Sequence, residues 1–285
     1  MRLVVRHQTI YRYGSGSSRV AMLLKLWPSE HEGQRVESWS VTVNDEPVAQ
    51  FVPNGHGDKD VLWIRHDRMD EANIVASGVV DTRDTAGVMT GLPQGADPLC
   101  YLRATPLTPV SAPMREALAA LEHADDLARL HALSQLVRDR VAYRAGVTVA
   151  GTSAAEAFDL GAGVCQDHAQ IFIAMARSMG IPARYVSGYL LADDDAGALH
   201  ETHAWAEARV PALGWVGFDV SNGLCVTERY IRLAAGLDAH DAAPVRGNAV
   251  AAGAITVDAD VRIDDSELSG GDARIQQLQE QQQQQ

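Results

Sequence analysis

The segment "GAGVCQDH" (residues 161–168) places Cys165 between a glycine-containing turn and a run with helical spacing. At a helix N-terminus, unpaired N–H groups and the macrodipole stabilise negative charge and so favour the thiolate form of a cysteine. Its position therefore makes Cys165 a candidate nucleophile. A free buried cysteine otherwise behaves as a small hydrophobic residue, which is our interpretation of Cys100 and Cys225.

A thiolate nucleophile needs a histidine that pairs with it and protonates the leaving group, and a third group that orients the imidazole. In "HETHAWAEARVPALGWVGFDVSN", His203 opens one predicted strand and Asp219 closes the next, with "PALG" as the turn. A five-residue loop from Val210 to Gly214 sets one register. In it His203 lies opposite Ser221, and Asp219 becomes a diagonal neighbour on the same face, about 7–8 Å away at Cα. A four-residue loop would put His203 and Asp219 on opposite faces.

The helix that begins at Cys165 is predicted from its apolar spacing. Gly180 stands where a C′ glycine belongs, and Pro182 prevents the helix from continuing. The residues that share one face of this helix are Ala169, Phe172, Met175, Ala176 and Met179. We therefore expect Cys165 in the first turn of a buried helix.

The rest of the chain divides into a strand-rich and a mixed part. The first ninety residues contain four β-branched or aromatic runs, which predict a meander or a small sandwich. Residues 91–113 carry five of the eleven prolines and read as a linker. After Ser111, a predicted N-cap, come helices with an apolar stripe over 127–141, and then strands, the last at 254–263. We expect an α+β fold, with helices that precede an antiparallel sheet.

These segments resemble the bacterial transglutaminase-like family, part of the papain-like group of cysteine enzymes. The similarity lies in "GVCQDHAQIFIAMARSMGIPARYVSGYL" and "HAWAEARVPALGWVGFDVSNG". "YRY" (11–13) and "LWPSEHEGQRV" (26–36) are similar to that family's β-rich N-terminal domain, and "AHDAAPVRG" (239–247) to its segment before the last strand. The chain departs from the family pattern at His168, Gln170 and the Asp219-Val220-Ser221 run.

The resemblance implies a domain plan and a catalytic triad. It predicts a β-rich N-terminal domain over 1–100 and a transglutaminase-like (papain-like) catalytic domain over 101–266, of helices packed on an antiparallel sheet. Residues 267–285 form a low-complexity, Gln-rich tail. It implies Cys165 as nucleophile, His203 as base and Asp219 as orienting carboxylate, with no cofactor and no metal. The expected activity is acyl transfer from an amide through a Cys165 thioester, as a peptidase or amidase rather than a protein cross-linker.

Several other interpretations stay open. A transglutaminase would resolve the thioester with an amine, and an inactive binding protein would keep the triad residues without turnover. A zinc site would combine Cys165 and His168 with His200 and His203, although residues three apart on a strand point to opposite faces. The acidic triplet at 193–195 suggests calcium, but its spacing does not match an EF-hand loop.

Three further side chains near the triad have competing roles. His168 falls one turn after Cys165, and either lies near the thiol or covers polar surface. Asp167 is interpreted as a first-turn carboxylate favoured by the helix dipole. Trp205 and Trp215 are expected in the core or in a pocket wall. Gln166 and Tyr143 are candidates for a second oxyanion donor, beside the Cys165 N–H.

Charge and composition restrict the partners. The formal net charge is −13, which would repel a phosphate backbone, so nucleic acid is not expected as a partner. Neither a signal sequence nor an apolar run long enough for a membrane span is present, and three unevenly spaced cysteines do not suggest a disulfide framework. We expect a cytoplasmic protein that acts on a peptide or small amide, away from membranes.

Overall fold

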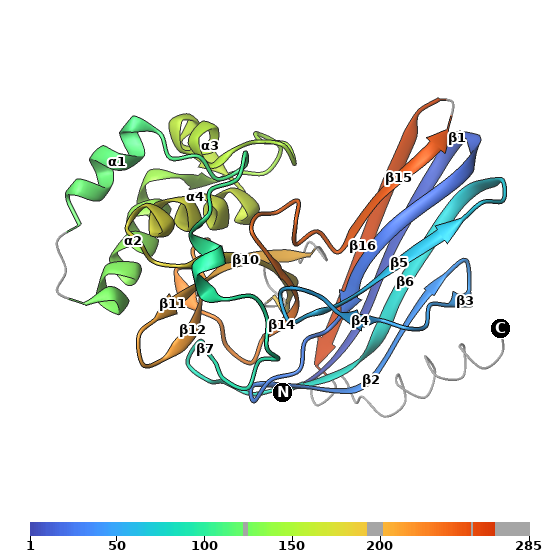
Figure 1. Cartoon of the computed structure of the whole chain (residues 1–285), viewed down its shortest axis with the longest axis horizontal. Helices are drawn as coiled ribbons and strands as arrows, with labels where there is room; N and C mark the ends of the chain where they lie inside the picture. Colours follow the sequence, from blue (N-terminus) through green and yellow to red (C-terminus); the bar gives the residue numbers. More distant parts are fainter. Residues whose placement is uncertain (122–124, 193–201, 252, 266–285) are drawn as a thin grey trace.

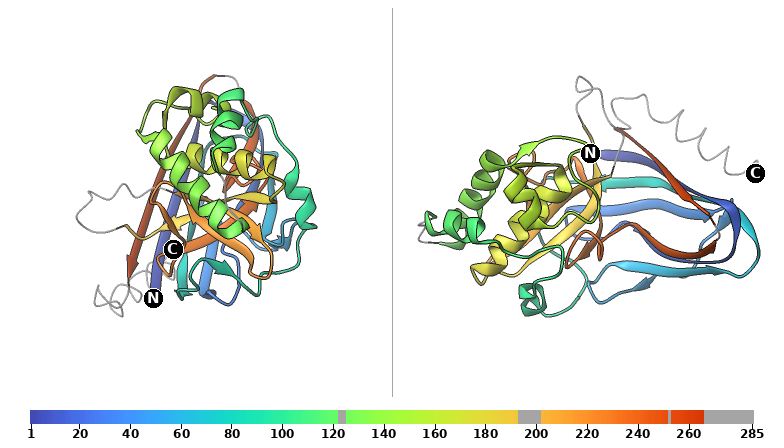
Figure 2. Two further views of the ribbon diagram at one scale, coloured as in Figure 1. Left: turned by 90° about the vertical axis from the view of Figure 1, so that its left-hand side faces the viewer. Right: turned by 90° about the horizontal axis from the view of Figure 1, so that it is seen from above.

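A computed structural model describes residues 1–121, 125–192, 202–251 and 253–265. It is rich in strands, with one long sheet, one shorter sheet, and helices that cover the shorter sheet on the side away from the long one (Figure 1). The view from above shows the same sequence of layers, with the long strands extending away from the helices (Figure 2). In the described ranges, no helix is both long and apolar enough to cross a membrane.

The long sheet is built around β1 (Arg2–Trp27). In its first part, Leu3, Val5, His7 and Thr9 are buried while the residues between them are half-buried, the period of two that a strand with one covered face requires. The strand order is β3-β2-β6-β1-β5-β4, and β15 and β16 also pair with β1. The bounds of these strands are β2 (Gln34–Val43), β3 (Glu46–Pro47), β4 (Val52–Pro53), β5 (Lys59–Arg65), β6 (Met69–Thr82), β15 (Val245–Ala251) and β16 (Ile255–Asp265).

The last predicted strand does not pair where the sequence led us to expect it. The strand expected at 254–263 forms as β16, but it pairs with β1, from Leu3↔Asp265 to Tyr13↔Ile255, and not with the sheet of the catalytic domain. Conversely, β7 (Val88–Met89) belongs to the first hundred residues in the sequence, but it pairs with β12 of the shorter sheet. Alternation predicts that a strand exists, but it carries no information on which strand is its partner. The sheets therefore exchange strands across the boundary predicted at residue 100.

The shorter sheet is antiparallel and follows the helices in the chain, as expected. Its order is β13-β12-β11-β10-β14, with β7 beside β12. Its strands are β10 (Ala183–Leu190), β11 (His203–Val210), β12 (Gly214–Asp219), β13 (Leu224–Cys225) and β14 (Tyr230–Gly236). The helices are α1 (Ala112–Ala119), α2 (Asp126–Arg140), α3 (Ala154–Leu160) and α4 (Cys165–Ser178), after a 3-10 turn at Pro98–Leu102 in the linker. The N-cap predicted at Ser111 is present, because its side chain accepts the Met114 N–H.

Helix α4 is the centre of the helical layer. It contacts α2 and α3 on one side and β10 and β11 on the other, so every residue from Asp167 to Arg177 is buried, and not only the predicted face. It ends as predicted: Gly180 has φ +80°, its N–H donates to Arg177, and the Ile181 N–H donates to Ala176 at 3.0 Å. These two bonds form a Schellman motif, which satisfies the last carbonyls of the helix.

Candidate active site

Cys165 is the first residue of α4, and its side chain is half-buried against the main core. The preceding Val164 has no side chain that can cap the helix, so Asp167 supplies the cap by accepting the Val164 N–H at 2.8 Å. Gly163 makes this approach possible, because a Cβ there would lie 2.6 Å from Asp167 Oδ2. The N–H of Cys165 itself, in the first turn, has no acceptor within the helix.

His203 and Asp219 meet across the β11–β12 hairpin. Val210 pairs with Gly214 and Ala206 with Phe218, which is the register of the five-residue loop and places both side chains on one face. His203 Nε2 lies 2.7 Å from Asp219 Oδ2. The diagonal arrangement predicted from the sequence is therefore present, and the alternative with opposite faces is wrong.

Asp219 is fully buried and holds three donors besides the imidazole. Its Oδ2 accepts the Tyr230 hydroxyl at 2.7 Å and the Asn222 side-chain amide at 2.6 Å, and its Oδ1 accepts the Asn222 N–H at 3.2 Å. Burial alone would raise the pKa of Asp219, but the hydrogen bonds from His203, Tyr230 and Asn222 lower it below its usual 3.8. The carboxylate is held ionised beside the imidazole.

Sequence reasoning missed Asn222 and Tyr230. Asn222 had a local signal, since an aspartate whose carboxylate bonds the backbone a few residues ahead is a common turn device. Tyr230 had none, because β14 is brought next to the site only by the folding of the sheet.

Cys165 is the second side chain that acts on the imidazole. Burial would lower the pKa of His203, but hydrogen bonds to Asp219 and to Cys165 outweigh it and raise the pKa from 6.5 to about 10. Because Nε2 is bonded to Asp219, the nitrogen available to the thiol is Nδ1. The structure thus brings together the three residues expected to form the triad.

Aromatic rings fix the plane of the imidazole. The ring of His203 stacks on Trp205 at a centroid distance of 6.3 Å, and Tyr230 packs on both. Trp205 is buried, as expected for a core residue, and its ring passes over Gly188 on β10, where a Cβ would come within 2.5 Å of it. Gly188 is therefore required for Trp205 to support the histidine. Trp215 instead packs edge-on against Tyr101, away from the triad.

His168 is a structural residue and not a surface one. It is buried, its Nε2 donates to the Val141 carbonyl at 2.8 Å, and its Nδ1 accepts from Ser221 Oγ at 2.9 Å. The interpretation that it covers polar surface is wrong, because it ties α4 to the end of β12. Both ring nitrogens of His168 are hydrogen-bonded, and Nε2 of His203 is bound to Asp219. The arrangement of these two histidines therefore does not support a shared zinc site.

The other sequence candidates are distributed around the first turn of α4. Asp167 is a capping carboxylate, and it also accepts the Thr148 hydroxyl at 2.7 Å. The Gln166 amide donates to the Ala150 carbonyl at 3.3 Å, so it is turned to that loop, whereas Tyr143 stacks on the ring of His168. His200 and the acidic triplet at 193–195 lie outside the described residues, as does the tail at 267–285.

The part of the chain that the structure describes contains no candidate metal site. No group of three or more His, Cys, Asp or Glu side chains there could hold a metal ion. All three cysteines are free. Cys225 is half-buried and fits the predicted role of a small hydrophobic residue, but Cys100 is exposed, so that interpretation of it is wrong.

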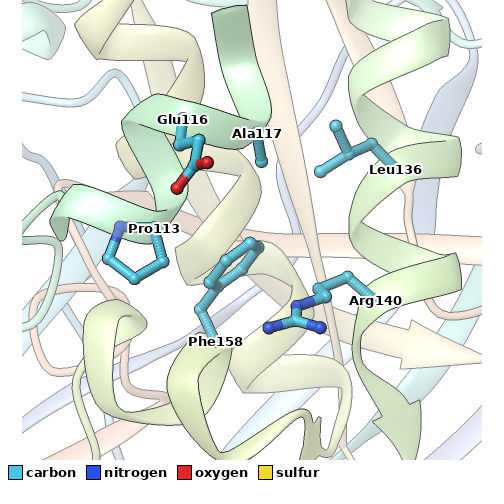
Figure 3. Close-up of a pocket in the computed structure, with 6 residues that line it drawn as sticks. All are labelled: Pro113, Glu116, Ala117, Leu136, Arg140 and Phe158. Atoms are coloured by element: carbon cyan, nitrogen blue, oxygen red, sulfur yellow. The ribbon is translucent and has the colours of Figure 1, made fainter. Parts of the chain in front are cut away.

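A pocket of about 270 Å³ lies between α1, α2 and α3 (Figure 3). Its chemical groups are one carboxylate and one guanidinium, with the guanidinium of Arg140 over the ring of Phe158 at 5.6 Å. The residues that line it are Pro113, Glu116, Ala117, Leu136, Arg140 and Phe158. None is a nucleophile and none belongs to the triad, so the pocket is separate from the candidate active site.

Two family models match the chain. The bacterial transglutaminase-like N-terminal region matches residues 3–81, and the transglutaminase-like superfamily core matches residues 116–220, which include Cys165, His203 and Asp219. Strands β15 and β16 lie beyond both matches.

Two related proteins come from mycobacteria. An uncharacterized protein of Mycobacterium leprae is 39% identical over 136 residues, which are 46% of this chain and 48% of that protein. One of Mycobacterium tuberculosis is 40% identical over 114 residues, 37% of this chain and 36% of that protein. The matched stretches thus span half or less of these relatives.

One solved structure shares the fold over nearly the whole chain. A candidate cysteine protease from Cytophaga hutchinsonii superposes with a TM-score of 0.74 at 21% identity, and the match covers 93% of this chain and 90% of that one. At this identity the likeness establishes the fold alone. The two family matches place this chain in the transglutaminase-like superfamily, with the bacterial transglutaminase-like N-terminal region before the core.

Proposed function

We propose that this protein is a cysteine-dependent acyl-transfer enzyme that cleaves amide bonds through a thioester on Cys165. The observation that supports the proposal most is the 2.7 Å hydrogen bond between His203 Nε2 and buried Asp219, together with Cys165 and Asp219 as the two groups that raise the pKa of His203 to about 10. Such a histidine stays protonated at neutral pH, so its partner thiol is paired with a cation. A buried cysteine with a purely structural role requires no such arrangement.

The chemistry follows from these groups. Thiolate Sγ of Cys165 attacks the amide carbonyl carbon, a C–S bond forms, and the oxygen that gains negative charge accepts the Cys165 N–H. Protonated Nδ1 of His203 gives its proton to the amide nitrogen as the C–N bond breaks, which leaves a thioester. Water then loses a proton to Nδ1 and attacks the thioester, the C–S bond breaks, and the carboxylic acid leaves.

Asp219 orients the ring through these steps. Because it is buried and holds Nε2 at 2.7 Å, the imidazole presents Nδ1 to the thiol in both protonation states. Tyr230 and Asn222 fix the carboxylate in turn. The proposed substrate is a peptide or a small amide, with no cofactor.

The test is intact-mass spectrometry of the protein incubated with an amide library, with and without a primary amine. The expected result is an acylated Cys165 that decays in water to the free acid. If the acyl group goes instead to the amine in preference to water, the enzyme is a transamidase. A parent protein that is never acylated, and whose Cys165 is no more reactive than an unperturbed thiol, contradicts the proposal and favours a binding function.

A further inference from the structure

Exposed apolar side chains lie beside the first turn of α4, where the thiol is. Tyr143 is 61% exposed, Val147 38% and Val149 74%, all in the segment that precedes α3. Single exposed apolar side chains are common on protein surfaces, but several of them close together mark binding sites.

This segment is fastened to the thiol end of the helix. Tyr143, in β8 (Ala142–Tyr143), pairs with Gly163, in β9 (Ala162–Gly163), and the Arg144 N–H donates to the Gly163 carbonyl at 2.7 Å. Thr148 and Ala150, the neighbours of Val149 in the chain, are both bonded to the first turn of α4. The Thr148 hydroxyl donates to Asp167, and the Ala150 carbonyl accepts the Gln166 amide. The loop around Val149 is therefore fastened to the first turn of α4, which begins at Cys165, while the Val149 side chain stays exposed.

A fourth apolar side chain flanks the triad from the sheet. Leu224 on β13 pairs directly with Asp219 on β12, and residues directly opposite each other in a sheet share a face. Leu224 therefore lies on the face that carries Asp219 and His203, and it is 45% exposed. We call Tyr143, Val147, Val149 and Leu224 the apolar rim.

We propose that the apolar rim binds aliphatic side chains of the acyl substrate next to the carbonyl that Cys165 attacks, so that the enzyme selects apolar peptides. The inference rests on the proposed function, and it names the substrate class for that site. Its physical basis is the transfer of aliphatic surface from water to a rim that is already fixed by hydrogen bonds, so little ordering is needed on binding. The competing case is an acidic substrate, because Arg144 is exposed in the same segment.

The experiment uses the full chain and three matched probes, the chloromethyl ketones of N-acetyl-leucine, N-acetyl-serine and N-acetyl-glutamate. Each forms a C–S bond with Cys165 and releases chloride, so the alkylation rate reports recognition without turnover. Iodoacetamide, which carries no side chain, gives the intrinsic reactivity of the thiol for normalisation. We expect the leucine probe to react about 10-fold faster than the serine probe, and the glutamate probe to be no faster than serine.

Matched variants assign the preference to the rim. Val149→Thr and Leu224→Asn keep size and charge nearly constant while adding a polar group, and together they are expected to bring the leucine-to-serine ratio to within about threefold of one. The controls are Val250→Thr on β15 and Val257→Thr on β16, which are comparably exposed on the long sheet and are expected to keep the parent ratio.

The outcomes separate this inference from the proposed function. If iodoacetamide labels Cys165 rapidly but serine or glutamate reacts as fast as leucine, only the rim inference is overturned. A leucine preference that survives in the double variant overturns it as well. If iodoacetamide and all three probes leave Cys165 unmodified, the proposed function fails, and the rim inference fails with it.

Discussion

Two buried clusters of charge lie on the same face of the shorter sheet, and they differ mainly in their cation. On β11, His203 and Glu207 are four residues apart and so share a face, and on β14, Tyr230 and Arg232 are two apart. His203 pairs with Asp219 in the candidate active site. Glu207 belongs to an ion cluster, which we define as Asp58, Arg184, Glu207 and Arg232.

The ion cluster joins the two sheets. Glu207 lies 2.9 Å from Arg232 and 2.7 Å from Arg184, and Arg232 also contacts Asp58 in the connection between β4 and β5. Two positive and two negative side chains balance, and burial, which would raise the pKa of Glu207, is outweighed by both arginines, which lower it to about 2. All four carboxylate oxygens accept hydrogen bonds.

The carboxylates of the two sites are equally well satisfied, so the difference lies in the partner. A guanidinium does not release its proton in a protein, whereas an imidazole does, and His203 has a second nitrogen that faces a half-buried thiol. The same device, a buried carboxylate under a cation, therefore fastens the domains in one place and is equipped for proton transfer in the other.

The largest effect is expected at the thiol. Cys165→Ser should lower turnover by at least about 10⁴-fold, because a hydroxyl is far less acidic than a thiol and the histidine is arranged to pair with a thiolate. Steady-state kinetics and thermal melting measure the two sides of the comparison, and melting should be nearly unchanged. Cys100→Ser, the same change at an exposed thiol, is the control and should keep parent activity. Activity within a few-fold of the parent in Cys165→Ser would refute the assignment of the nucleophile.

Asp219→Asn should reduce turnover by about 10²–10⁴-fold, since the amide no longer stabilises the imidazolium or fixes its tautomer. The pH profile of thiol alkylation should shift to higher pH at the same time. The loss of stability should be smaller, about 1–3 kcal/mol for a disturbed buried hydrogen-bond network. If turnover and stability fall in parallel with an unmoved alkylation profile, Asp219 only ties the hairpin together.

Glu207→Gln makes the same change of carboxylate to amide in the ion cluster, and the opposite pattern is expected. It leaves two buried arginines with one carboxylate, so the free energy of unfolding should fall by about 3–5 kcal/mol. Turnover per folded molecule, normalised by titration of reactive thiol, should stay within a few-fold of the parent. A large loss of turnover without a loss of stability, measured by urea unfolding, would mean that the ion cluster acts on the triad and that the two clusters are not separable.

The sequence predicts the relative placement of His203 and Asp219 better than it predicts the pairing of distant strands, for a physical reason. The position of Cys165 at a helix start and the His203–Asp219 diagonal depend on local rules of capping, periodicity and hairpin register. The return of β16 to β1, and the approach of Tyr230 to Asp219, depend on which distant strands meet, and no local pattern records that. His168 shows the same limit, because helical spacing places it near the thiol but says nothing of Val141 and Ser221, which take up both its nitrogens.

The smallest expected effect is the change in the free energy of unfolding per pH unit that the His203–Asp219 pair produces. The pKa of His203 is raised from 6.5 to about 10 on folding, so the stabilisation is fully present below pH 6.5 and is lost as pH rises to about 10. Within that window the folded state binds up to one more proton than the unfolded state, and the free energy of unfolding falls by at most about 1.4 kcal/mol per pH unit.

The ion cluster and the other buried histidines add no slope in this window, whereas burial raises the pKa of the Cys225 thiol above 9.0 and adds a decline above about pH 9 that is the same with and without Asp219. The ion cluster contributes no slope there, because arginine stays charged and the pKa of Glu207 is about 2. Burial lowers the pKa of both His7 and His31 to about 4, so each is neutral in the folded state and destabilises the fold only as pH falls below 6.5. Asp219, whose pKa is lowered, contributes stability above pH 3.8 and none of the change between pH 6.5 and 10.

The measurement is urea unfolding from pH 6 to 10 in a Cys165→Ser background, with and without Asp219→Asn. Because this background removes the contribution of Cys165 to the raised pKa of His203, the decline that remains is the part due to Asp219. We expect stability to decline with pH when Asp219 is present and the decline to be much shallower when it is replaced. Glu207→Gln in the same background is the matched control, and it should lower the whole curve without changing its slope. Equal slopes with and without Asp219 would show that the carboxylate does not hold the proton on His203. The two buried clusters would then not differ in proton binding in the way that their cations, an imidazole and a guanidinium, indicate.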